Sequence, residues 1–178
     1  MRLKKEAGGG DTMKHKTAFM GMFLALALIC SYVESLIPFY FGIPGVKLGL
    51  ANLVVVVMLY LTGTKEAFLI SMLRILLAGF LFGNPFSIIY SLSGGILSFL
   101  VMFLLKKTEK LHVVSISVAG GVFHNIGQLG VAAAVVENYN LFYYMPVLLV
   151  AGFLTGLLIG ILAQEMIVRM QGRMRPRE

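Results

Sequence analysis

Aspartate is nearly absent from this sequence, in which Asp11 is the only one. Sites that bind phosphate or diphosphate through Mg²⁺ hold the metal with carboxylates, and a two-aspartate site of this kind cannot be built here. The sequence therefore excludes the aspartate-rich Mg²⁺ chemistry that enzymes use to carry away diphosphate. We predict no catalytic residues and no metal site.

Cysteine and histidine are also scarce. Cys30 is the only cysteine, so the chain can form no intramolecular disulfide and no cysteine-based metal cluster. His15, His112 and His124 are too scattered for a recognisable zinc spacing. The phosphate-binding pattern Gly-x-x-x-x-Gly-Lys-Ser/Thr does not occur, so any energy must come from partners or from a gradient. We expect no cofactor.

Charge is low throughout the chain. Only 13% of the 178 residues are charged, against about 25% in a soluble domain, while 58% are hydrophobic and the mean hydropathy is +0.89. These values predict an integral membrane protein with one compact domain. The net charge of +7 does not indicate nucleic acid as a partner, because the basic residues form short clusters between apolar runs.

The apolar runs predict an all-α, polytopic membrane helix bundle of about six transmembrane helices. The expected spans are residues 17–36, 48–61, 67–82, 86–105, 115–136 and 141–167. A flexible basic tail of residues 1–16 precedes a transmembrane domain of residues 17–168, and a basic tail of residues 169–178 follows it. The second and third spans are short for a full crossing, which takes roughly 20 residues.

The distribution of basic residues predicts the orientation in the membrane. Six spans place both ends of the chain on one side, and 13 of the 15 lysines and arginines lie on that side. Of the other two, Lys47 lies in an opposite loop and Arg74 inside a span. Because cytoplasmic loops carry the excess of basic residues, we expect both termini in the cytoplasm and the protein in the cytoplasmic membrane.

Two spans carry polar side chains at depths where such groups are costly unless they face protein, water or a ligand. Arg74 lies near the middle of the third span. In the fifth span, His124 and Gln128 are one helical turn apart on the same face, with Asn125 beside them. Each has a structural alternative, because Arg74 can pair with Glu34 and the fifth-span group can make polar contacts between packed helices. The functional alternative is one solute site.

The predicted topology places further polar residues toward the outer half of the membrane. They are Glu34, Lys47, Asn52, Asn84 and Tyr90. The outer ends of the first four spans and the middle of the fifth can therefore line one cavity that opens outward. In it, Lys47 and Arg74 would suit a solute with a negative group, amides would read its neutral polar edges, and Tyr90 and Phe39 would stack on its apolar part.

Five motifs in combination resemble a known family. They are Glu34–Pro38, Gly45–Asn52, Arg74 with Phe82–Asn84, Tyr90–Gly95 and His124–Gln128. Together they resemble the bacterial membrane family called heptaprenyl diphosphate synthase component I, also known as the Gx transporter family, over about residues 16–165. In size and six-span layout that family is similar to the substrate-binding S-components of energy-coupling-factor vitamin transporters, which is a likeness at the level of the fold.

The likeness to S-components implies that solute binding, membrane coupling and ATP hydrolysis are carried out by separate chains. The solute would bind near the outer side, and ATPases on separate chains would supply the energy. The small-residue face of the first helix would dock on a shared transmembrane coupling subunit. In this sequence the small residues of that face are Gly21, Ala25, Ala27 and Ser31.

Three functions stay open from the sequence. The leading hypothesis is an S-component-like membrane subunit that binds and transports a small anionic or amphipathic metabolite and is energised by partner subunits. The second is a non-catalytic membrane accessory subunit in isoprenoid or quinone metabolism, which the family name implies. The third is a structural subunit of a membrane redox complex.

Overall fold

The computed structural model describes residues 3–36 and 49–174 of the chain, and the side chains of residues 16–36 and 49–172. The described chain is all-helical, as the sequence predicts. Its elements are α1 (Leu3–Leu36), α2 (Leu50–Leu61), α3 (Thr64–Phe82), α4 (Pro85–Lys107), α5 (Val113–Val136), the 3-10 helix η1 (Tyr139–Tyr144) and α6 (Met145–Met174).

The first and last helices are longer than the sequence suggests. α1 begins at Leu3, so the basic stretch interpreted as a tail is helical and continues the first span. α6 continues to Met174, beyond the expected start of the C-terminal tail at residue 169. The physical reason is that adding a residue to an existing helix is much easier than starting a new one, so a stable span can extend into polar sequence.

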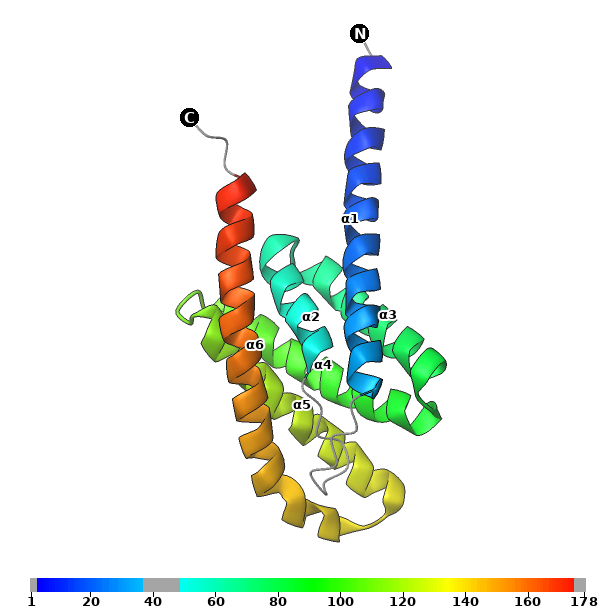
Figure 1. Cartoon of the computed structure of the whole chain (residues 1–178), viewed down its shortest axis with the longest axis vertical. Helices are drawn as coiled ribbons and strands as arrows, with labels where there is room; N and C mark the ends of the chain where they lie inside the picture. The colour runs from blue at the N-terminus through cyan, green and yellow to red at the C-terminus, as the bar shows by residue number, and fades with distance from the viewer. Residues whose placement is uncertain (1–2, 37–48, 175–178) are drawn as a thin grey trace.

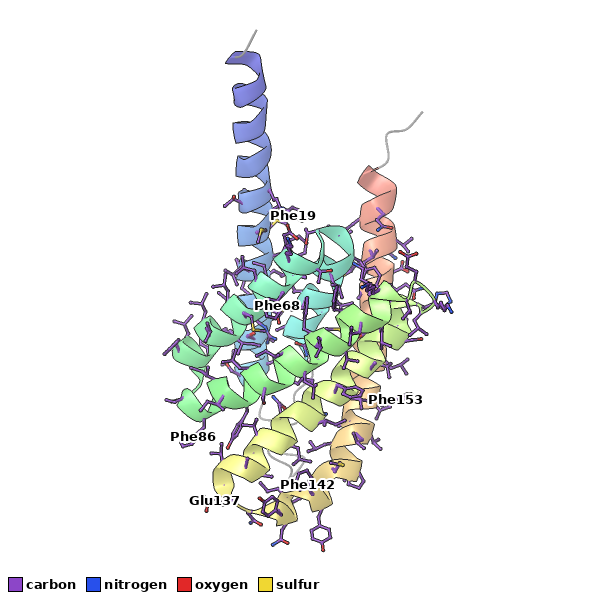
Figure 2. All side chains as sticks on the ribbon, turned by 180° about the vertical axis from the view of Figure 1, so that it is seen from behind. Phe19, Phe68, Phe86, Glu137, Phe142 and Phe153 are labelled. Carbon is purple, nitrogen blue, oxygen red and sulfur yellow. The ribbon has the colours of Figure 1, made fainter. Side chains whose placement is uncertain are left out.

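The helices form two layers that cross obliquely. α1, α2 and α6 lie in one layer, and α3, α4 and α5 run across its back (Figure 1). The first half of α1 extends beyond the rest of the bundle (Figure 1). The start of α1 and the end of α6 lie at the same end of the molecule, and Figure 2 shows Glu137 and Phe142 at the opposite end.

α2 is the central element of the apolar core. Six consecutive residues, from Val54 to Leu59, are buried, so the helix is covered on every side. Its neighbours are α1, α3 and α6, and the same core cluster includes Phe23, Phe99 and Ile167. A helix that is apolar all round belongs inside a bundle. With 12 residues, α2 is about 18 Å long, much shorter than the roughly 30 Å hydrocarbon core of a bilayer.

α5 packs on α6 through glycines. A Cβ atom placed on Gly121 would lie 2.4 Å from the carbonyl oxygen of Gly152. One placed on Gly156 would lie 2.7 Å from the Cα of Val118. Because both neighbours are backbone atoms, the two helices can approach this closely only where side chains are absent. Contact of this kind holds α5 and α6 in a fixed register.

The helix composition makes the chain a membrane protein. Four stretches of the described chain are long and apolar enough to cross a bilayer, residues 16–36, 85–107, 113–136 and 139–172. Large apolar side chains such as Phe80 and Leu158 are exposed on the surface, where lipid would cover them. α2 is short and α3 carries Lys65, Glu66 and Arg74, so a count of six crossings stays a prediction.

Candidate functional site

A polar cavity lies between the helices, and all six α-helices contribute to its wall. Its volume is about 300 Å³, at the lower end of the range for small-molecule sites. Six of the nine residues predicted to bind solute line it. They are Glu34, Asn52, Arg74, His124, Asn125 and Gln128. The structure therefore brings together residues that are up to 94 positions apart in the sequence, from Glu34 to Gln128.

Arg74 of α3 is the cation of the described cavity wall. Its Nη2 donates a hydrogen bond of 3.0 Å to the Oδ1 of Asn52 on α2. Its Nε–H is buried and has no hydrogen-bond partner among the residues that the structure describes. No carboxylate oxygen of the described chain lies within 4.0 Å of its guanidinium nitrogens. Asn52 thus orients the guanidinium while leaving donors that no described acceptor satisfies.

Glu34 has a different partner from the one that the sequence offers. Its Oε1 accepts a hydrogen bond from the backbone N–H of Gly49, the residue that caps the N-terminus of α2. Gly49 adopts a left-handed conformation, with φ at 74°, and has no side chain to cap the helix itself. A carboxylate at a helix N-terminus satisfies an orphan N–H and interacts favourably with the helix dipole. Glu34 therefore caps α2 from α1 while its side chain also lines the cavity.

The fifth-span group combines packing and lining. His124 and Gln128 pack on Gly94 of α4, where an added Cβ would lie 2.7 Å from the Gln128 Cγ and 3.1 Å from the His124 Cε1. Asn125 turns toward α6 and donates a hydrogen bond of 2.7 Å from its Nδ2 to the carbonyl oxygen of Leu148. All three line the cavity. The two alternatives for this motif are therefore not exclusive, and Asn125 is held by a helix contact at the cavity wall.

Hydroxyl groups form much of the remaining wall, and sequence reasoning did not single them out as solute-binding residues. They belong to Ser31, Ser35, Ser87, Ser91, Ser98, Ser117 and Thr155. Ser117 donates a hydrogen bond of 2.8 Å to the carbonyl oxygen of Gly156, and Thr155 donates one of 2.9 Å to that of Ala151. The Ser31 Oγ is buried without a partner among the described residues. Ser31 and Ser35 on α1, and Ser87 and Ser91 on α4, are spaced four apart and so share a helix face. Spacing of this kind does not show that the two faces meet, so only the fold brings these hydroxyls together.

Of the other three predicted solute-binding residues, two are absent from the described cavity wall and the third is outside the described residues. Asn84 is the N-cap of α4, where its Oδ1 accepts a 2.8 Å hydrogen bond from the Ser87 N–H and its own N–H is bound by the Ser87 Oγ. An asparagine directly before Pro85 is a recognisable cap signal. Tyr90 is half-buried on α4, outside the described cavity wall. Lys47, like the stacking candidate Phe39, lies outside the described residues.

The four small residues predicted to dock a partner divide between two faces of α1. Gly21 and Ala25 are exposed, and a Cβ on Gly21 would meet nothing within 4 Å. Ala27 is fully buried in the core, and Ser31 faces the cavity. Of the four predicted docking residues, only Gly21 and Ala25 are exposed to a partner.

The chemistry available in this cavity is recognition. Its described wall offers one guanidinium, one carboxylate, three amides, an imidazole and hydroxyls, which bind polar groups through hydrogen bonds and charge. Among the described residues, no three side chains of histidine, cysteine, aspartate or glutamate are grouped so that they could hold a metal ion.

Comparison with known proteins relates this arrangement to one family. The family model described as heptaprenyl diphosphate synthase component I matches residues 23–166. The matched stretch contains every described residue of the cavity wall. No curated protein and no solved structure matches the chain.

Proposed function

The chain belongs to the heptaprenyl diphosphate synthase component I family, and from this premise and the polar cavity we propose that it is a membrane subunit that binds a small solute with a negative group. The solute would enter from the outer side and be passed across the membrane with the help of partner subunits. The observation that carries the proposal is Arg74, whose guanidinium lines the cavity and has an unsatisfied buried Nε–H among the described residues.

The cost of burying polar groups supports this assignment. A guanidinium within a membrane bundle is costly unless an anion or several acceptors face it. The Asn52 amide is neutral, and it accepts a hydrogen bond from one of the five N–H donors of Arg74. An anionic group of a solute would accept from the others in the two-pronged geometry that arginine favours. Arg74 would therefore bind the negative group, and Asn52 would hold Arg74 in position.

The remaining residues would read the rest of the solute. His124, Asn125 and Gln128 offer donors and acceptors from α5. Lys47, which follows α1 in the chain, keeps its proposed role as a second cation. The exposed stripe of Gly21 and Ala25 on α1 is the proposed face for a coupling subunit, as the likeness to S-components implies. ATPases on separate chains would then supply the energy.

The direct test is to identify what the protein carries. The protein would be purified in mild detergent from its native host and analysed by untargeted mass spectrometry, beside the variants Arg74→Gln and Lys65→Gln. We expect a small molecule on the wild type and on Lys65→Gln, whose charge is exposed at the start of α3. We expect Arg74→Gln to lose it, because a hydrogen bond to a charged group contributes about 1.5–3 kcal/mol.

The result is decisive only if the variants stay folded, which size-exclusion chromatography checks. Bulk lipid alone on a monodisperse wild type would contradict solute binding. Retention of the small molecule by a folded Arg74→Gln variant would remove Arg74 from the site.

The family's description favours a second candidate function. It names a component of a heptaprenyl diphosphate synthase, so this chain would be a membrane subunit that supports a catalytic partner. The scarcity of aspartate fits a non-catalytic role, because head-to-tail prenyl transfer uses Mg²⁺ held by aspartates. Affinity purification at native expression level separates the two candidates. Stoichiometric recovery of a prenyl synthase would favour this one, and recovery of ATPases with a second membrane protein would favour transport.

A further inference from the structure

Glu34 and Arg74 carry opposite charges and line the same cavity without pairing with each other. We propose that the solute is a small zwitterion whose anionic group binds Arg74 and whose cationic group binds Glu34. This inference rests on the proposed function and narrows it from a solute with a negative group to one with both charges.

The two charges are held apart by separate hydrogen bonds. Arg74 is bound to Asn52 of α2, and Glu34 is bound to the Gly49 N–H at the N-terminus of the same helix. Asn52 itself belongs to that first turn, since its N–H donates to the Gly49 carbonyl oxygen at 2.8 Å. The start of α2 therefore holds both side chains at the cavity and gives each a partner other than the opposite charge.

Each charged group keeps capacity for a ligand. Arg74 retains its Nε–H, which no described residue accepts. Glu34 uses Oε1 for the Gly49 N–H, and the described chain gives Oε2 no hydrogen-bond donor. A carboxylate has room for about four hydrogen bonds and a guanidinium for five. A ligand with an anionic and a cationic end would satisfy both groups at once.

A solute with only a negative charge fits this wall less well. The Glu34 carboxylate would repel it. Such a solute would give Arg74 an acceptor but would leave the Glu34 carboxylate without a cationic partner. Multiply charged anions such as diphosphates fit worst, because Arg74 is the single cation among the described lining residues. Like charges in a low-dielectric site repel strongly, so the one positive and one negative side chain of the described wall favour a solute that carries both charges over a multiply charged anion.

The cavity also limits the size of the zwitterion. Its volume of about 300 Å³ corresponds to roughly ten water molecules at about 30 Å³ each. The hydroxyls and amides around the two charges suit neutral polar edges of a solute, and apolar lining side chains such as Val56, Ile75 and Met102 suit a short hydrocarbon part. The class is therefore that of amino acids and compounds of similar size.

Matched probes test the charge requirement. The purified wild type would be titrated by isothermal calorimetry with glycine, β-alanine, γ-aminobutyrate and ε-aminocaproate, which differ in the separation of their charges. Butyrate and butylamine are the single-charge controls for γ-aminobutyrate. We expect one amino acid of the series to bind at least about tenfold more tightly than the single-charge compound of its length, since each charge-assisted hydrogen bond contributes about 1.5–3 kcal/mol.

Variants of Glu34 and Arg74 show which residue binds the amino group of the probe and which binds its carboxylate. Glu34→Gln can still accept from the Gly49 N–H, so α2 stays capped while the negative charge is lost. It should remove the advantage of the amino group and leave carboxylate binding unchanged or stronger. Arg74→Gln should remove binding of both. The conservative variant Arg74→Lys should restore part of it.

The zwitterion would be overturned if γ-aminobutyrate and butyrate bound equally and no amino acid of the series bound more tightly than butyrate. That result would leave the proposed anion site intact. Stronger binding of the amino acids to Glu34→Gln than to the wild type would also overturn it. Absence of binding by every probe to a monodisperse wild type would overturn this class of solute. The proposed function would then be tested by the co-purified molecule alone, because its mass and formula identify a bound solute of any class.

Discussion

Two sides of the bundle, the α5–α6 contact and the surroundings of α2, are packed by different means. Between α5 and α6 the contact is backbone on backbone, as at Gly121 and Gly152. Around α2 it is side chain on side chain, with Phe23 and Phe99 in one apolar cluster. Backbone contacts leave no rotamer to adjust, whereas side-chain contacts can repack at moderate cost. The cavity is lined from both sides, so we expect its α5 wall to be more rigid than the wall formed by α1, α2 and α3.

The largest expected effect comes from disturbing the fixed side. Gly121→Ala places a methyl group 2.4 Å from the Gly152 carbonyl oxygen, and overpacking of this kind typically costs about 1–3 kcal/mol. The matched control is Gly130→Ala in the same helix, where an added Cβ meets nothing within 4 Å. Heating in detergent followed by size-exclusion chromatography would compare the two. Equal loss of monodisperse protein in both variants would contradict the fixed α5–α6 contact.

Adjacent glycines of α4 compare the two kinds of packing directly. A Cβ on Gly94 would lie 2.7 Å from the His124 carbonyl oxygen, whereas one on Gly95 would meet only the side chains of Ile75 and Met72 within 4 Å. Gly94→Ala should therefore lower stability more than Gly95→Ala, and it should weaken solute binding because it displaces His124 and Gln128. Melting and calorimetry on both variants check this. A Gly95→Ala variant that is the more damaged of the two would reverse the comparison.

On the adaptable side, the C-terminus of α2 offers a smaller test. The Lys106 ammonium of α4 donates to the Leu59 carbonyl oxygen and lies 4.8 Å from the centre of the Tyr60 ring. Lys106→Met keeps most of the aliphatic volume and removes both contacts, so we expect a loss of about 1–2 kcal/mol. Lys107→Met is the control, because Lys107 is exposed. Similar melting of the two variants would show that the contact contributes little.

The smallest effect is expected at the contact between Lys16 of α1 and Glu66 of α3. The Lys16 hydrogen bond lowers the pKa of the Glu66 carboxyl below its ordinary value of 4.5. A lowered carboxyl pKa stabilises the fold above the ordinary pKa, and this stabilisation is lost as the pH falls through the lowered pKa. Wild type should therefore melt slightly higher than Glu66→Gln at neutral pH, and the difference should vanish in acid. The gain is small because exposed ion pairs contribute little. A difference that grows in acid would contradict the sign.

The sequence predicts the helices well and the contacts between them less well. Hydropathy and the turn residues locate the spans, and the depth of Arg74 and His124 marks them as inward-facing. Spacing cannot choose the partner of a buried charge. Glu34 was one alternative for Arg74, yet Arg74 bonds to Asn52 while Glu34 accepts from the Gly49 N–H, both at the start of α2. Asn84 illustrates the reverse, since its place before Pro85 is a cap signal that the search for a solute site overlooked.

α2 depends on other helices at both of its ends. Glu34 of α1 binds the N–H at its start, and Lys106 of α4 binds a carbonyl oxygen of its last turn, so a carboxylate and an ammonium complement the two poles of its dipole. The consequence concerns the order of assembly during synthesis. Lys106 leaves the ribosome some 45 residues after α2 is complete. α2 is too short to span a bilayer alone, so we expect it to reach its final environment only after α4 has been inserted and Lys106 can bind the Leu59 carbonyl oxygen.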